Sequence, residues 1–198
     1  MEQYDTKVIE NSSRERRRRR RKRRIAYGAL FLLVAYGIVW FLQQRVTTTM
    51  IFVRHAEPVS AEMNAPLSGA GQLRAQQLKE MLRGVGVGRS VDAIFASREY
   101  ASQQTVTPVA NMLELPVETM DSNNVDLFRE TVLSYREGDV VLVATTADRI
   151  APLITVFGGS ANIPEIGAND YDNIYVVVVP WFGKEKTLRF KYGQPSIN

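Results

Sequence analysis

Residues 48–57 read TTMIFVRHAE, and this stretch decides the fold class. Its first six residues are apolar or β-branched, which is typical of a strand buried on both faces of a sheet. The polar residues Arg54, His55 and Glu57 follow directly. Because ligands of open α/β sheets bind beyond the carboxyl ends of the strands, the stretch predicts a strand that delivers an arginine and a histidine to a binding site.

Strand and helix patterns alternate along the rest of residues 46–198. Further strands are expected at residues 91–95, 140–144, 174–179 and 188–192. Amphipathic helical patterns cover residues 67–82, 99–113, 125–135 and 150–157. This alternation predicts a three-layer α/β domain at residues 46–198, with a mostly parallel sheet and helices on both faces.

Composition excludes several kinds of site. The chain contains no cysteine and one histidine among 198 residues. It therefore has no disulfide framework, no thiolate nucleophile and no site built from several histidines. We expect a site that uses neither a metal nor a cofactor.

Charge is segregated along the chain. Residues 1–24 carry eleven Lys or Arg against four acidic residues, whereas residues 25–198 carry fourteen against seventeen. The basic character thus belongs to the N-terminal tail, and we expect no nucleic-acid binding by the folded part. We expect residues 1–24 to be a disordered cytoplasmic tail whose basic run, from Arg16 to Arg24, contacts anionic lipid headgroups.

An uncharged stretch follows the basic tail. Residues 25–42 read IAYGALFLLVAYGIVWFL and would span roughly 27 Å as a helix. No small-residue cleavage site follows in FLQQRVTTT, and a core helix directly behind nine cations is unfavourable. We therefore expect a single transmembrane helix at residues 25–44, a signal-anchor. The charge bias places the N-terminus in the cytoplasm and the globular domain outside it, in the periplasm of a bacterium.

A histidine beside an arginine at a strand end can act on phosphorus. The imidazole nitrogen of His55 would be the nucleophile, and the guanidinium of Arg54 would bind the phosphoryl oxygens. This chemistry requires a neutral imidazole held in one tautomer. A lone histidine is more often structural, so its place at the strand end is what favours chemistry here.

Several segments together resemble the histidine phosphatase superfamily, which has the phosphoglycerate-mutase-like fold. The segments are IFVRHAE (51–57), PLSGAGQLRAQQL (66–78), DAIFASREYASQQT (92–105), VVLVATTADRIAPLI (140–154) and DYDNIYVVVVP (170–180). The resemblance covers residues 48–192 and is greatest to the short branch near bacterial phosphohistidine phosphatases. It implies a metal-free phosphatase in which His55 is phosphorylated and Arg54 holds the phosphoryl group.

The sequence also departs from that pattern. The position of the family's second phosphate-binding arginine falls on Ala101, and that of its second histidine falls on Thr146. Neighbouring side chains are candidates for binding the substrate instead: Ser97, Arg98, Thr145, Thr146 and Arg149. The proton donor stays open between Glu118, Asp121 and Glu130.

Three functions remain compatible with these residues. The first is a membrane-anchored phosphatase that hydrolyses a phosphorylated small molecule or phosphoprotein through a phosphohistidine at His55. The second is a weak or inactive pseudophosphatase that binds an anion or a protein. The third is a structural or assembly role. The state of the pocket around His55 separates them.

Overall fold

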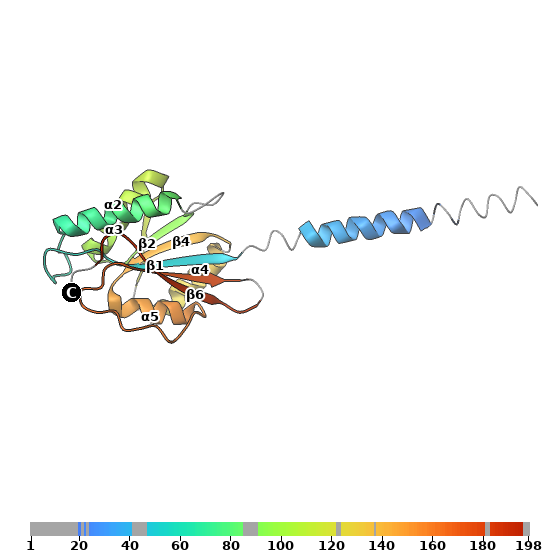
Figure 1. Ribbon diagram of the computed structural model, residues 1–198. Helices are drawn as coiled ribbons and strands as arrows, with labels where there is room; N and C mark the ends of the chain where they lie inside the picture. Colours follow the sequence, from blue (N-terminus) through green and yellow to red (C-terminus); the bar gives the residue numbers. More distant parts are fainter. Residues whose placement is uncertain are drawn as a thin grey trace, which may run out of the picture. The chain divides into compact units, whose positions relative to one another are not determined.

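The computed structural model describes residues 20, 22, 24–40, 47–84, 91–121, 124–136, 138–180 and 183–195 (Figure 1). The chain divides into two compact units, Met1–Arg45 and Val46–Asn198.

In the first unit, residues 24–40 form an uninterrupted helix with exposed apolar side chains. Among the described residues, no helix combines the length and the apolar character needed to cross a membrane. The prediction of a transmembrane helix at residues 25–44 is therefore wrong, and so is the single-pass localisation that rested on it.

Other predictions for this unit fall largely outside what the structure describes. The disordered tail at residues 1–24 includes residues 1–19, 21 and 23, which lie outside the described residues. Lipid binding by the run from Arg16 to Arg24 depended on the membrane helix and loses its support with it.

The second unit is built on a six-stranded mixed sheet of order β3-β2-β4-β1-β5-β6. The strands are β1 (Thr48–Arg54), β2 (Ala93–Ala96), β3 (Val117–Thr119), β4 (Val140–Thr145), β5 (Asn173–Val179) and β6 (Lys186–Lys191). The first four strands are parallel to one another, β5 pairs antiparallel with β1, and β6 pairs antiparallel with β5 at the edge of the sheet. Strand β3 was not expected from the sequence.

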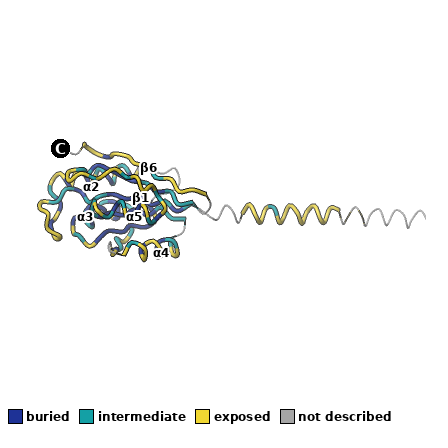
Figure 2. The backbone as a smooth tube through the Cα atoms, turned by 90° about the horizontal axis from the view of Figure 1, so that it is seen from below, coloured by how far each residue is buried: buried dark blue, intermediate teal, exposed yellow. Residues whose placement is uncertain are grey.

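Helices cover both faces of this sheet (Figures 1 and 2). They are α2 (Gly69–Gly84) and α3 (Tyr100–Leu113) on one face, and α4 (Val125–Tyr135) and α5 (Ala147–Val156) on the other. Alternate residues of β1 enter the two cores, with Ile51 and Val53 facing α2 and α3, and Met50 and Phe52 facing α4 and α5. The three-layer α/β prediction is confirmed.

The middle of the sheet positions the candidate site. Strands β1 and β4 lie side by side at its centre, and their parallel pairing ends at Arg54 and Thr145. Strand β2 ends at the same edge, since it runs parallel to β4. The carboxyl ends of three buried strands thus meet just before His55.

A close approach between α2 and the chain after β1 fixes the first turn of that helix. The backbone N–H and the hydroxyl of Ser68 both donate to the carbonyl oxygen of Glu57, at 2.9 and 3.0 Å. The N–H of Gly71 donates to the Ser68 hydroxyl at 3.1 Å. A β-carbon at Gly71 would collide with the carbonyl oxygen of Glu57, so only glycine fits there.

We predict that Gly71→Ala destabilises the protein by about 2 kcal/mol because the added methyl group meets backbone that cannot yield. For a domain of this size, that lowers the melting temperature by about 4–8 °C. Thermal unfolding followed by circular dichroism measures the change. Gly69→Ala is the matched control, because no atom lies within 4 Å of a β-carbon there. Equal melting temperatures for the two variants would contradict the packing argument.

Candidate active site

His55 follows β1 and is held by two hydrogen bonds. Its backbone N–H donates to the carbonyl oxygen of Thr145 at 2.9 Å, which continues the β1–β4 pairing by one residue. Its ring Nδ1 lies 2.9 Å from the carbonyl oxygen of Ala56. Because a carbonyl oxygen can only accept, Nδ1 carries the proton and Nε2 keeps its lone pair. The imidazole is therefore oriented with its nucleophilic nitrogen available.

Burial keeps this imidazole neutral. It lowers the pKa of His55 below 6.5, and the charge of Arg54 acts in the same direction. The hydrogen bond to Ala56 and the carboxylates of Glu99 and Glu57 oppose the shift without cancelling it. A nucleophilic histidine must be deprotonated at Nε2, and this environment favours that state near neutral pH.

Arg54 lies against a segment that follows α5. Its Nη1 donates to the carbonyl oxygens of Gly167 at 2.9 Å and of Asp170 at 3.5 Å. The guanidinium carbon lies 4.0 Å from the centroid of the Tyr171 ring, a cation–π contact. These contacts fix the guanidinium beside His55.

The charge of Arg54 is not neutralised by an acidic partner. Within the described chain it forms no ion pair with a carboxylate, and its Nε is buried without a hydrogen-bond partner. Burial lowers the pKa of Arg54, although Tyr171, Asp170 and Glu57 act against the shift. A half-buried cation with an unpaired donor is costly, and a bound anion relieves that cost.

Thr145 supplies a second unpaired polar group at this edge. It pairs with Arg54 across β1 and β4, so both side chains leave the same face of the sheet. The residue is fully buried, and its Oγ1 has no hydrogen-bond partner among the described residues. Nε of Arg54 and Oγ1 of Thr145 are thus two buried groups without hydrogen-bond partners. A bound oxyanion would supply the acceptor that both of them lack.

Two helices begin at the same edge. Helix α3 follows β2 and helix α5 follows β4, so both N-termini face the carboxyl side of the sheet. Neither N-cap residue, Glu99 or Thr146, makes a side-chain capping hydrogen bond. The partial positive charge of a helix N-terminus adds to the attraction for an anion.

Ser97 is inside the protein rather than in an open site. Its hydroxyl donates to the Ser102 hydroxyl at 2.8 Å, and both residues are fully buried. Ala101 is also buried, packed in a small cluster with Ala56. The N–H of Ala56 donates to Oγ1 of Thr105 at 2.8 Å, which fastens α3 to the residue after His55.

The remaining predicted binding residues lie nearer the surface. Arg98 is exposed, and its carbonyl oxygen accepts from Gln103 at 3.2 Å. Nε of Arg149 lies 3.2 Å from a carboxylate oxygen of Asp148, and its side chain is 37% exposed. Thr146 is half-buried at the start of α5.

The three candidate proton donors lie in different places. Glu118 accepts a hydrogen bond from Arg136 at 2.5 Å on the outer strand β3. Glu130 is exposed on α4, and Asp121 is exposed just after β3, at the edge where the parallel strands end.

Tyr171 was not among the residues predicted for the site. Its ring lies under Arg54 and its centroid is 6.0 Å from that of His55, although it stands far from both along the chain. No local motif marks a tyrosine at that distance, since only folding brings it to the site.

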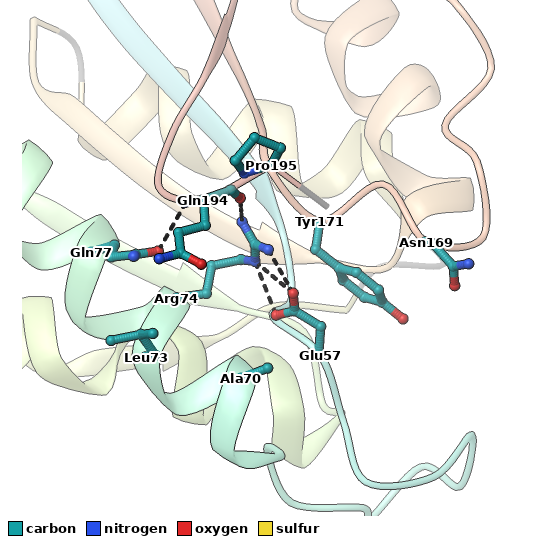
Figure 3. A pocket seen from close by; sticks show the side chains of 9 residues that line it. All are labelled: Glu57, Ala70, Leu73, Arg74, Gln77, Asn169, Tyr171, Gln194 and Pro195. Carbon is teal, nitrogen blue, oxygen red and sulfur yellow. Dashed lines mark hydrogen bonds and ion pairs between the residues drawn. The ribbon is translucent and has the colours of Figure 1, made fainter. Parts of the chain in front are cut away.

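A cavity of about 320 Å³ adjoins the site through Tyr171 (Figure 3). Its floor holds a nearly buried ion pair in which Nε of Arg74 lies 2.9 Å from both carboxylate oxygens of Glu57. Nη1 of Arg74 also donates to the carbonyl oxygen of Gln194 at 3.0 Å. The other lining residues are Ala70, Leu73, Gln77, Asn169 and Pro195. Across the described residues, no cluster of three or more histidine or acidic side chains is placed to hold a metal ion.

Solved structures of several phosphatases have the same fold. The protein histidine phosphatase SixA complexed with tungstate matches with a TM-score of 0.59 and 17% identity, over 72% of this chain and 96% of that one. The alpha-ribazole phosphatase from Shigella flexneri matches with a TM-score of 0.55 and 14% identity, over 76% and 98%. Mycobacterial glucosyl-3-phosphoglycerate phosphatase Rv2419c matches with a TM-score of 0.55 and 14% identity, over 74% and 98%.

The fold predicted from the RHAE segment and its companions is therefore confirmed: this chain contains a domain with the histidine phosphatase superfamily fold. No protein-family model and no curated protein matches the sequence. The roles of the individual site residues rest on the geometry above.

We predict that the imidazole of His55 titrates with a pKa below 6.5, because burial disfavours its charged form. His55 is the sole histidine, so its ring signals in a proton–nitrogen correlation spectrum need no assignment. In the unfolded protein in urea the same signals should titrate near the ordinary value of about 6.5. The unfolded state then binds more protons in that range, so stability falls as pH drops through it. A native-state pKa at or above the unfolded one would contradict the burial argument.

Proposed function

We propose that this protein is a phosphatase that hydrolyses a phosphorylated small molecule or phosphoprotein through a phosphohistidine at His55. The observation that carries the proposal is the pairing of a neutral imidazole with an arginine whose buried Nε lacks a partner. The histidine phosphatase fold supports it, because the pair lies at the carboxyl edge of the parallel strands of that fold.

In this mechanism each group has a defined task. Nε2 of His55 attacks phosphorus while the Nδ1–H···O hydrogen bond to Ala56 stabilises the positive charge that develops on the ring. Arg54 binds the phosphoryl oxygens, and Thr145 donates a hydrogen bond to the same group. Water then attacks the phosphorus of phosphohistidine, which releases phosphate and restores the imidazole.

The rest of the substrate has room beside Tyr171. The cavity lined by Gln77, Asn169 and Gln194 presents amide groups and apolar carbon rather than free charge, because Glu57 and Arg74 neutralise each other. Structures of the same fold carry names that refer to protein phosphohistidine and to small phosphate esters. We infer a substrate whose part beyond the phosphate is uncharged and forms hydrogen bonds.

Ala101 and Thr146 set an upper limit on the rate. A charged donor aimed at the transition state contributes on the order of 10²–10³ in rate. The two positions hold a methyl group and a hydroxyl group, so we propose slow turnover compared with a site that has the full set of cations. The buried Oγ1 of Thr145 and the α5 N-terminus compensate in part.

We predict that His55→Asn abolishes hydrolysis of 4-nitrophenyl phosphate, because it removes the nucleophile. Arg54→Lys should lower kcat/KM by about 10²–10³-fold, since a lysine cannot replace the fixed guanidinium contacts. Rapid acid-free quenching of the wild-type reaction should trap an acid-labile phosphoenzyme that His55→Asn does not form. Arg83→Lys, an exposed change on α2, is the control and should leave kcat/KM unchanged.

Two results would contradict the proposal. Turnover that persists in His55→Asn would assign the activity to another group. Absence of turnover in the wild type, with vanadate still raising the melting temperature, would favour the pseudophosphatase that binds an anion without reaction.

We predict that Thr146→His raises kcat/KM for 4-nitrophenyl phosphate by about tenfold or more, because it restores a donor at the start of α5. Thr146 is half-buried at the start of α5. Thr155→His adds the same side chain at an exposed position near the other end of α5 and serves as the control. Equal activities of the two variants would show that residue 146 does not face the reacting phosphoryl group.

A further inference from the structure

We propose that Glu99 is the proton donor to the leaving group and the base that activates water in the second step. This inference rests on the proposed function. It assigns the acid–base role to a residue outside the three candidates that the sequence offered.

The start of α3 brings Glu99 to the nucleophile. Glu99 is the N-cap residue of α3, at the carboxyl edge of β2. Two residues later, Ala101 packs against Ala56, and the Thr105 hydroxyl accepts from the N–H of Ala56. Since Ala56 follows His55 directly, these contacts fix the first turns of α3 beside the imidazole.

The carboxylate of Glu99 is not used for a structural hydrogen bond at Oε2 or for capping α3. Its Oε2 is buried and has no hydrogen-bond partner in the described part of the chain. Its side chain makes no capping hydrogen bond to α3. A buried carboxylate oxygen left without a partner is costly, and an active-site role is a common reason for such a group.

The carboxylate of Glu99 acts on the imidazole, because it raises the pKa of His55 against the effect of burial. Among acidic residues, Glu99 has the larger effect on the imidazole, ahead of Glu57 two positions away along the chain. Glu57 is bound by Arg74 and is therefore unsuited to exchange a proton with substrate. Among the described residues, Glu99 is the carboxylate that acts on His55 and has a buried oxygen without a hydrogen-bond partner.

The two steps balance as follows. In the first step the lone pair of Nε2 forms the N–P bond, the P–O ester bond breaks, and the leaving oxygen takes the proton of Glu99 to give an alcohol. In the second step water forms a P–O bond, Glu99 takes its proton, and the electron pair of the P–N bond returns to Nε2. The sum is an ester and water giving an alcohol and phosphate.

This role makes Glu99 important only for leaving groups that need a proton. Phenyl phosphate and 4-nitrophenyl phosphate have nearly the same shape, but phenolate is the more basic leaving group. For Glu99→Gln we expect kcat/KM to fall about 100-fold on phenyl phosphate and less than about tenfold on 4-nitrophenyl phosphate. A merely structural glutamate would affect the two substrates equally.

Glu114→Gln is the matched control because it removes the same charge from the other end of α3, where the side chain is exposed. It should leave both kcat/KM values unchanged. Glu99→Asp keeps the acid and should recover part of the loss on phenyl phosphate alone. Thermal unfolding of each variant checks that the fold is intact, and the Asp variant decides the question if Glu99→Gln does not fold.

The outcomes separate this inference from the proposed function. Hydrolysis that depends on His55, combined with equal effects of Glu99→Gln on both substrates, would overturn the role of Glu99 and leave the phosphatase proposal standing. Absence of any hydrolysis that depends on His55 would overturn both.

Discussion

The arrangement of the site depends on three successive backbone contacts at the end of β1. The N–H of His55 is bound by β4, its ring is bound by the Ala56 carbonyl, and the N–H of Ala56 is bound by Thr105 of α3. Strand β1 lies at the centre of the sheet, in the most buried part of the protein. These contacts therefore join the site to a rigid strand. The nucleophile, its tautomer and the neighbouring helix are thus fixed by one short turn.

Much of the α/β domain follows from local patterns. Strand β1 is buried on both faces and its residues up to Val53 are apolar or β-branched, so its position and its polar end could be predicted from TTMIFVRHAE. Strand β3 could not, because its three residues are only partly buried at the edge of the sheet and lack the run of apolar residues that marks an inner strand. The uncharged run at residues 25–42 predicted a membrane span, but no helix in the described part of the chain is long and apolar enough to cross a membrane.

The site, like the fold, depends partly on residues that are adjacent in sequence and partly on residues that are far apart in sequence. Arg54 and His55 are adjacent in sequence, and their chemistry is visible there. The carbonyl oxygen of Gly167, which orients Arg54, lies 113 positions away and carries no side-chain signal at all. Ser97 is a different case, because its residue type fits the motif. In the fold its buried hydroxyl donates a hydrogen bond to Ser102. A pattern of residue types cannot distinguish a ligand from a structural hydrogen bond.

The stacking of Arg54 on Tyr171 has a consequence for the thermodynamics of binding. A free arginine side chain carries about 2 kcal/mol of rotamer entropy, which an incoming ligand ordinarily has to remove. Here the aromatic ring and the Gly167 carbonyl have already restricted the side chain. An oxyanion therefore binds a guanidinium that is already restricted and that has one donor, Nε, without a partner. Its affinity should carry a small entropic penalty and should depend on the direction of approach as well as on charge.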